Sequence, residues 1–301
     1  MSFLNKILLG WSAALAGTLL FYGCNGGGDS NPAPGPSQQA TLQAFVGHVE
    51  GGAGNIDGIG PTAYFANLVA VTADRAGNLF VIDSHAIRKV SPSGSVTTLA
   101  GNIDLSGHVD GTAQEARFLF PRGIAIDSAG NVYVADDMTI RKITPVGVVS
   151  TFAGKLNEYG GEDGPVASAR FTGPSGLAID SSDNIYVAEP GASTIRKITP
   201  AGIVSTLAGS YGISGSNDGT KDVALFYQPW SVAVNQAGDI YVTDYGAVRK
   251  IANAGVVTTI AGQVGQSGYV DGAGTNARFG TMTGIAVDST GTFIWRTPTT
   301  T

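Results

Sequence analysis

The feature that most constrains the fold of this chain is a repeat with a period of about 53 residues. An Asp-Gly pair recurs at intervals of 53, 53, 55 and 53 residues, beginning at Asp57, Asp110, Asp163, Asp218 and Asp271. Similar text follows each pair and includes short apolar runs bounded by Gly, Asp, Asn or Pro. A repeat of this length is a supersecondary unit that buries its faces only against neighbouring units.

The apolar runs of each copy have the composition of short strands. In the second copy they are Gly-Ile-Ala-Ile-Asp, Asn-Val-Tyr-Val-Ala-Asp, Ile-Arg-Lys-Ile and Val-Ser-Thr-Phe-Ala-Gly, at 123–127, 131–136, 140–143 and 149–154. β-branched and aromatic residues are frequent in these runs, and turn residues separate them. We name the expected strands A to D and place A innermost, because it is small and almost wholly apolar. This pattern predicts an all-β fold, a β-propeller of four-stranded blades.

The text of strands B and C resembles the NHL repeat. The residues concerned are Gly130 to Asp136, followed by Ile140 to Ile143. The Ala-Arg-Phe and Ser-Thr-Leu-Ala-Gly elements resemble the subtype found in secreted bacterial NHL proteins. The resemblance covers residues 42–291 and implies a propeller of NHL blades that serves as a binding platform. It also implies an alternative, because a minority of related propellers are lyases or lactonases.

The two ends of the repeat region differ from its middle. Residues 42–47 align with the D strand at 96–101, so we expect a lone D strand that pairs with the last blade. Four complete blades and part of a fifth follow, and we assign residues 40–291 to the propeller. In 292–301 the repeat text is absent, but a shifted reading frame allows Asn-Ile-Tyr-Leu-Ala-Asp. We interpret 292–301 as a frameshifted tail, with a genuine Thr-rich tail as the alternative, and we expect an open arc of blades.

The N-terminal segment has the layout of a secretory signal. One lysine precedes an uncharged, mostly apolar stretch at 7–22, and Gly23-Cys24 follows it. This segment resembles the bacterial lipoprotein signal, which implies removal of residues 1–23 and lipidation of Cys24. Residues 24–39 are rich in Gly, Pro and Ser and form a tether. We therefore expect an extracytoplasmic protein held at the cell envelope by a lipid anchor, and the alternative is an uncleaved membrane anchor.

Composition excludes several partners and cofactors. The chain has 17 Lys and Arg against 23 Asp and Glu, a net charge of −6 with no basic run, so we expect no nucleic-acid partner. One cysteine leaves no internal disulfide and no cysteine-ligated metal site. No two of the three histidines have metal-ligand spacing, so we expect no metal and no cofactor.

Charged residues that recur in every copy are predicted to be structural. A carboxylate ends strand B and an arginine lies in strand C: Asp83, Asp136, Glu189 and Asp244, with Arg88, Arg141, Arg196 and Arg249. A ring of acids for metal or acid-base chemistry is the alternative interpretation. We favour a carboxylate-guanidinium contact inside each blade, because every repeat contains it. The Asp of each Asp-Gly pair is interpreted as a turn former.

Functional residues are expected where the copies differ. The position before strand A holds Val69, Arg122, Ser175, Trp230 and Thr283, and the loop after strand B contains His85, Met138, 190–194 and Tyr245. Both sets are expected on one face of the propeller, around one end of its central channel. The predicted binding residues are those of hot-spot type, Arg122, Trp230, Tyr245, His85 and Met138.

The predicted function is a non-enzymatic binding or scaffold module that uses one propeller face to bind a protein, a peptide or a glycan. The alternatives are an extracytoplasmic lyase or lactonase and a purely structural surface protein. No nucleophile motif is visible in the sequence, and no catalytic residue is assigned.

Overall fold

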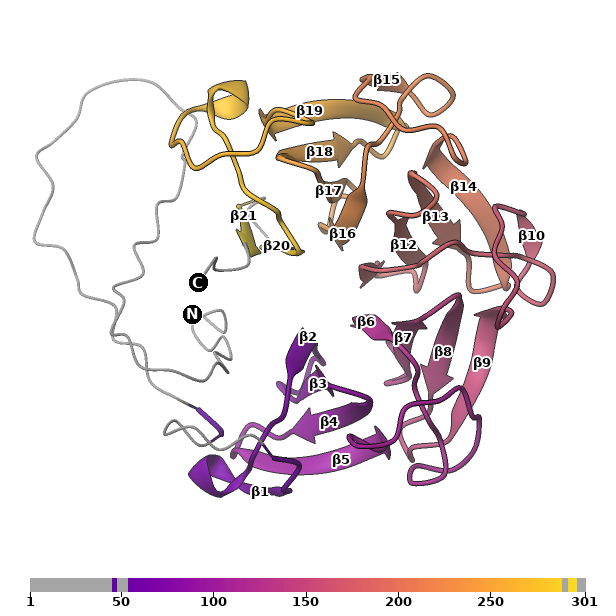
Figure 1. The fold of residues 1–301 in the computed structure, drawn as a ribbon, viewed down its shortest axis with the longest axis vertical. Coiled ribbons are helices and arrows are strands. Elements are labelled where there is room, and N and C mark those ends of the chain that lie inside the picture. Colours follow the sequence, from indigo (N-terminus) through magenta and orange to yellow (C-terminus); the bar gives the residue numbers. More distant parts are fainter. Residues whose placement is uncertain (1–44, 48–53, 289–291, 297–301) are drawn as a thin grey trace, which may run out of the picture.

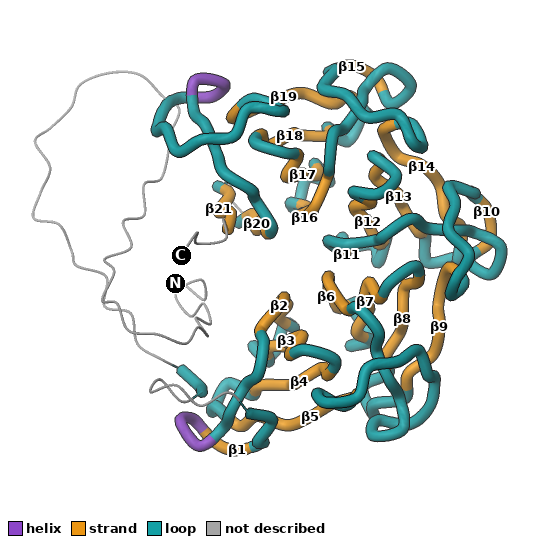
Figure 2. Tube along the Cα trace, in the orientation of Figure 1, coloured by secondary structure: helices purple, strands orange, loops and turns teal. Residues whose placement is uncertain are grey.

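The computed structural model describes residues 45–47, 54–288 and 292–296, and antiparallel sheets surround a common centre in this part of the chain (Figure 1). Apart from two short 3-10 turns, η1 (Gly60–Thr62) and η2 (Gly274–Asn276), its regular elements are strands. Long loops run from the outer strand of one sheet back to the inner strand of the next (Figure 2). The predicted all-β propeller fold is confirmed.

Four sheets follow the predicted order of strands A to D from the centre outward, and we call them blades 1 to 4. Blades 1 and 2 contain β2 (Leu68–Ala73), β3 (Leu79–Asp83), β4 (Ala86–Val90) and β5 (Ser95–Gly101), then β6 (Pro121–Ile126), β7 (Val132–Asp136), β8 (Thr139–Ile143) and β9 (Val149–Gly154). Blades 3 and 4 contain β11 (Leu177–Ile179), β12 (Ile185–Glu189), β13 (Thr194–Ile198) and β14 (Ile203–Gly209), then β16 (Pro229–Val234), β17 (Ile240–Asp244), β18 (Ala247–Ile251) and β19 (Val256–Gly262).

A short strand from the loop before each blade covers part of its outer edge. β1 (Gly58–Ile59), β10 (Gly164–Pro165) and β15 (Gly219–Thr220) begin at the Gly of an Asp-Gly pair and pair with β5, β14 and β19. In blade 2 an isolated bridge between Gly111 and Val149 takes this place. Because a free strand edge invites pairing with other chains, this contact protects the D strands.

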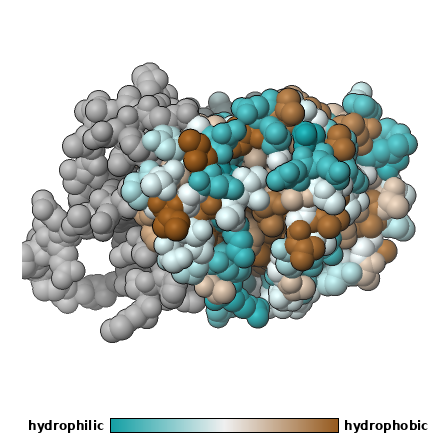
Figure 3. Space-filling view, turned by 90° about the horizontal axis from the view of Figure 1, so that it is seen from below, coloured by the Kyte–Doolittle hydropathy of each residue, from teal (hydrophilic) through white to brown (hydrophobic). Residues whose placement is uncertain are grey.

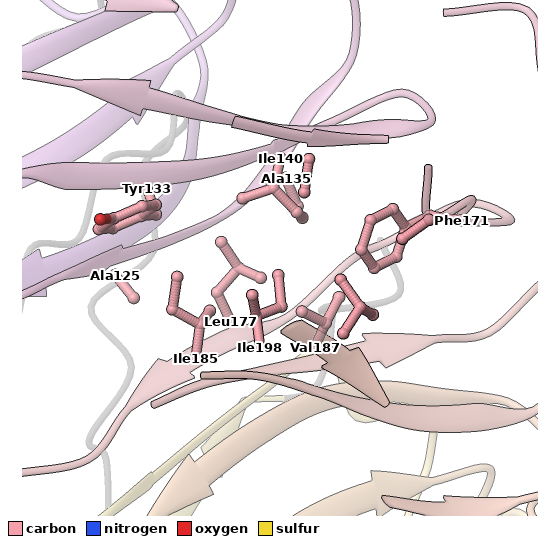
Figure 4. Close-up of a cluster of buried hydrophobic side chains, with 12 residues drawn as sticks. Ala125, Tyr133, Ala135, Ile140, Phe171, Leu177, Ile185, Val187 and Ile198 are labelled. Carbon is pink, nitrogen blue, oxygen red and sulfur yellow. The ribbon is translucent and has the colours of Figure 1, made fainter. Parts of the chain in front are cut away.

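Apolar side chains fill the space between successive blades. Figure 4 shows the cluster between blades 2 and 3, whose labelled residues are buried: Ala125, Tyr133, Ala135, Ile140, Phe171, Leu177, Ile185, Val187 and Ile198. Similar clusters lie between blades 1 and 2 and between blades 3 and 4. Blades 2 and 3 therefore bury both of their faces against neighbouring blades, as the repeat pattern requires.

The inner strands approach one another closely at one end of the channel. A Cβ added to Gly123 would lie 1.9 Å from the carbonyl oxygen of Ser175, and one added to Gly176 would lie 2.5 Å from the Cα of Ser231. The backbone N–H of Gly176 donates to the carbonyl oxygen of Trp230 at 2.8 Å. Glycine is required at these positions because the backbones of adjacent blades touch there.

The first described residues, 45–47, contact blade 1. They occupy the position that the end of a D strand occupies beside the blade that follows it. The N–H of Gly47 donates to the carbonyl oxygen of Gly60 at 3.1 Å, as the N–H of Gly101 donates to that of Ala113 at 2.8 Å one copy later. Val46 is buried in a cluster on blade 1. This placement agrees with the alignment of 42–47 to a D strand. Its pairing with a last blade stays a prediction, because residues 42–44 lie outside the described part.

After blade 4 the chain forms a two-stranded sheet from β20 (Gly284–Val287) and β21 (Phe293–Arg296). Val287 lies opposite Phe293, the register that places Ile126 opposite Val132 in blade 2. The chain thus forms a B strand after residue 291, where the repeat text ends, because Phe, Ile and Trp favour strands. The frameshift stays a hypothesis, and residues 297–301 lie outside the described part.

The described strands form an arc with blade 1 at one end and β20 and β21 at the other (Figure 1). The predicted signal at 1–23, the lipidation site Cys24 and the tether at 24–39 lie outside the described residues. Within the described ranges, no helix is both long and apolar enough to span a bilayer.

Candidate functional site

The arginine of strand C lies between two carboxylates in every complete blade. In blade 2, Arg141 donates from Nη1 to Asp136 at 3.0 Å and from Nη2 to Asp110 at 2.6 Å. Its side chain is fully buried, and its guanidinium carbon lies 5.3 Å from the centroid of the Phe118 ring. The equivalent groups are Arg88 with Asp83 and Asp57, Arg196 with Glu189 and Asp163, and Arg249 with Asp244 and Asp218.

The predicted structural contact between strands B and C is therefore confirmed. The interpretation of the Asp-Gly aspartates as turn formers was incomplete, because those of the four complete blades also bind the buried arginine and the D strand. Asp110 accepts from the Thr151 N–H at 2.9 Å and from its hydroxyl at 3.2 Å. One aspartate thus joins the loop, strand C and strand D of a blade.

The two carboxylates that bind each arginine differ in how deeply they are buried. Burial raises the pKa of Glu189 to about 7, against the opposing effect of Arg196. Burial raises the pKa of Asp83 and Asp244 in the same way. For the outer Asp110, burial also acts to raise the pKa, but hydrogen bonds from a threonine N–H and the arginine hold it below its usual value. These groups bind protein donors, which gives them a structural role.

The position before strand A brings two predicted binding residues together. Arg122 is exposed at the start of β6 in blade 2, and Trp230 is half-buried at the start of β16 in blade 4. The guanidinium carbon of Arg122 lies 5.9 Å from the centroid of the Trp230 ring, a cation-π contact. Ser175 of blade 3, which lies between them in the repeat order, is buried and small. Arg122 of blade 2 therefore reaches past blade 3 to Trp230 of blade 4.

Arg122 differs from the repeated arginines because no acid neutralises it. Among the described residues it forms no ion pair and no side-chain hydrogen bond, and the indole N–H of Trp230 donates no hydrogen bond there. The position before strand A contains no carboxylate in any copy. The guanidinium therefore keeps its donors available beside an aromatic face.

The loops after strand B lie on the same face as the loops before strand A, as predicted. The N–H of Ser84, beside His85, donates to the carbonyl oxygen of Asn67 at 2.8 Å, and this contact joins the two kinds of loop in blade 1. His85, Met138 and Tyr245 are half-buried. No polar or ring contact among the described residues links His85 or Met138 to the Arg122–Trp230 pair. The structure brings together only part of the predicted set.

Tyr245 contacts a residue that sequence reasoning missed. Its ring centroid lies 5.2 Å from that of Tyr227, and the ring planes are inclined at 34°. Tyr227 is 44% exposed and precedes Trp230 by three residues in the same loop and strand of blade 4. The signal available in the sequence was a tyrosine directly after the Phe of the repeat, where the other copies have Ala, Leu, Thr and Gly. We call Arg122, Trp230, Tyr227 and Tyr245 the mouth residues.

The opposite end of the channel has a different character. A depression of about 530 Å³ lies among the turns between strands A and B, and its lining includes Asp74, Asp127, Asp180, Asp183 and Arg75. The carboxylates cap turns: Asp127, for example, accepts from the N–H of residue 131 at 2.8 Å. Within the described ranges, no group of three or more His, Cys, Asp or Glu side chains is placed to hold a metal ion.

The side of the molecule seen in Figure 3 has a mixed surface. Figure 3 shows hydrophilic and hydrophobic residues interspersed over the described part of the side that faces the viewer. Exposed apolar residues such as Ile59 and Val148 lie on the short outer or connecting segments. Scattered apolar residues are normal on a protein surface.

Two protein-family models match the sequence. The Teneurin NHL domain matches residues 106–160, and the NHL repeat matches residues 226–248. Teneurin-4 of Mus musculus is 27% identical over 216 residues, which are 62% of this chain and 8% of teneurin-4. Teneurin-3 of Danio rerio is 28% identical over 219 residues, which are 65% of this chain and 8% of teneurin-3. The chain thus spans about 8% of the length of these relatives.

Solved structures resemble the fold. An auxiliary nutrient binding protein from Bacteroides ovatus has a TM-score of 0.57 and 17% identity, over 77% of this chain and 56% of that one. A protein of unknown function from Bacteroides thetaiotaomicron has a TM-score of 0.52 and 23% identity, over 81% of this chain and 70% of that one. The sequence matches, the repeated blades and these likenesses together support an NHL-repeat protein with a β-propeller fold.

Proposed function

We propose that this protein is a non-enzymatic binding module of the cell envelope whose ligand enters the channel end formed by the mouth residues. The observation that carries the proposal is the exposed Arg122 guanidinium, which lies over the Trp230 ring and forms no ion pair with an acid in the part of the chain that the structure describes. Arginine and large aromatic residues contribute most of the binding energy in many interfaces.

The residues at this channel end favour binding over catalysis. The position before strand A holds Val69, Arg122, Ser175, Trp230 and Thr283, and none of these side chains is a histidine or a carboxylic acid. His85 lies on the same face, but no polar or ring contact among the described residues links it to the Arg122–Trp230 pair. A lyase or a lactonase needs a general base or a metal ion at its reaction centre. No observation therefore favours the alternative function, that of a lyase or a lactonase.

The known proteins add indirect support. The Bacteroides ovatus protein with a similar fold is a nutrient binding protein, so this architecture is compatible with a binding role. The lipoprotein-like signal leads us to propose lipidation at Cys24 and a position outside the cytoplasm. The protein would then bind its ligand at the cell envelope.

The test of the binding proposal is a set of immobilised glycans and peptides probed with three forms of the protein. We expect the wild-type chain to retain a defined subset and the double variant R122A/W230A to lose it. Arg75→Ala is the matched control, because Arg75 is an exposed arginine at the opposite channel end. The proposal fails if the wild type retains nothing, or if the double variant binds as the wild type does.

The location is tested separately. Cells that express the full chain are labelled with a radioactive fatty acid, and the Cys24→Ala variant is the control. We expect label on the wild-type protein and none on the variant. An unlabelled wild type would contradict the lipid anchor, and this result would leave the binding experiment unaffected.

A further inference from the structure

The donors of Arg122 define what the mouth residues would bind. A guanidinium carries five N–H donors in a planar fork that matches the two oxygens of a carboxylate. The buried arginines of the blades use this fork on protein acids, but Arg122 has no acid partner among the described residues. Its contact with Trp230 also holds the fork in one orientation, which lowers the entropy lost on binding.

The charges along the channel favour an anion at this end. The chain has a net charge of −6, and the opposite channel end contains Asp74, Asp127, Asp180 and Asp183. At this end the position before strand A has one charged residue, Arg122, and in the described loops after strand B the one acid is Asp137 of blade 2. The aspartates of the loops before strand A, such as Asp110 and Asp163, lie farther out, where they bind the buried arginines and the D strands. Beside the channel, an anionic group therefore meets a cation at this end and carboxylates at the other.

The groups around the arginine match a sugar better than a phosphate. Trp230 is half-buried, and the part of its indole ring that Arg122 leaves uncovered can stack against the C–H face of a pyranose ring. Hydroxyl groups lie on the same face of the propeller in Thr283, Tyr227 and Tyr245, and they provide donors and acceptors for sugar hydroxyls. The mouth residues and the position before strand A include a single cation, whereas phosphate sites normally combine several donors.

We infer that the mouth residues bind an acidic oligosaccharide, with the carboxylate of a uronic acid on the Arg122 fork and its pyranose ring on Trp230. This inference rests on the proposed binding function and narrows it to one class of ligand. Arg122 selects the charge of the sugar, and Trp230 supplies the stacking surface for any sugar that enters.

The test compares acidic sugars with their uncharged esters by calorimetric titration. The probes are oligomers of galacturonate, glucuronate and mannuronate, the methyl esters of the same oligomers, and a peptide with a free C-terminal carboxylate. We expect at least one oligouronate to bind at least tenfold more tightly than its ester. The preference should shrink as salt rises, because the partners carry opposite charges.

Variants distinguish the selection of charge by Arg122 from the stacking of the sugar on Trp230. We expect Arg122→Ala to bind the acid and its ester equally weakly, and Arg122→Lys to keep only part of the preference because a lysine lacks the fork. Trp230→Ala should weaken both ligands alike, and Arg75→Ala should change neither. Urea unfolding of each variant confirms that a loss of binding is not a loss of fold.

Several results would overturn the inference, and all but the last of them leave the proposed function intact. The inference is wrong if no oligouronate binds more tightly than its ester, or if Arg122→Ala keeps the preference. Binding of neutral glycans or of the peptide that depends on Arg122 and Trp230 would overturn the inference and leave the binding module intact. Absence of any ligand from the glycan and peptide set would overturn both.

Discussion

The two carboxylates on each buried arginine differ in environment, and this difference predicts unequal contributions to stability. Asp136 is fully buried and accepts from the N–H groups of Leu119 and Phe120, both at 2.8 Å, as well as from Arg141 at 3.0 Å. The side chain of Asp110 is 48% exposed and lies closer to Arg141, at 2.6 Å. Distance alone would rank Asp110 first, whereas burial ranks Asp136 first.

The expected magnitudes follow from what each removal leaves behind. Asp136→Ala leaves an arginine charge without its buried partner and two backbone donors without an acceptor, and we expect a loss of about 3–5 kcal/mol in the free energy of unfolding. Water replaces much of what Asp110→Ala removes, so we expect a loss of about 1–2 kcal/mol there. A domain with a stability of about 5–15 kcal/mol tolerates both changes, which makes them measurable.

The assay is urea unfolding followed by tryptophan fluorescence, with hydrogen exchange to locate the loosened segments in blade 2. The double variant D136A/R141L is the control, because it removes the unpaired charge together with the carboxylate. We expect the double variant to be more stable than Asp136→Ala alone. The reasoning is refuted if Asp110→Ala costs as much as Asp136→Ala, or if the double variant is no better than the single one.

Three further predictions concern packing and charge. Gly123→Ala places a Cβ 1.9 Å from the Ser175 carbonyl oxygen and should cost more than about 2 kcal/mol in urea unfolding, and an unchanged midpoint would contradict the close approach at the hub. Burial raises the pKa of Glu189 to about 7, so the folded state holds this proton more tightly than the unfolded state, and the free energy of unfolding should fall as pH rises from about 4.5 to about 7. Glu189→Gln should remove this component when unfolding is measured across that range, and equal slopes for the two proteins would argue against it. Glu158→Gln breaks an exposed contact to Arg170 and should leave the unfolding midpoint unchanged, so a clear shift would show that this pair matters.

Much of the fold was predictable because each blade repeats the same strand pattern and the same contacts within the blade. The Gly-Ile-Ala-Ile-Asp text predicted an inner strand, and the contact between Asp136 and Arg141 was expected because every copy contains both residues. The second partner, Asp110, was missed because it lies 31 residues from the arginine and reads as a turn residue. β21 was also missed, because Phe293–Arg296 departs from the repeat text and forms a strand through its own β propensity and its pairing with β20.

The candidate site was predictable only in part. Comparing the copies identified Arg122 and Trp230 as unusual residues at one position of the repeat, but it could not separate them from His85 and Met138. Tyr227 escaped notice because it lies outside the two variable positions that were compared. A residue's partner in such a ring depends on how far its side chain reaches across the channel, and no local pattern records that distance.

The sequence by itself determined the repeated architecture: stacked four-stranded blades, the glycines of the inner strands and a paired charge in each unit. These features depend on interactions within one repeat or between consecutive repeats, so the same text produces them each time. Only the tertiary structure decided that Arg122 of blade 2 lies over Trp230 of blade 4 while Ser175 stays below them. The physical reason is the narrow hub, where backbones in contact bring side chains from non-consecutive blades within reach of one another.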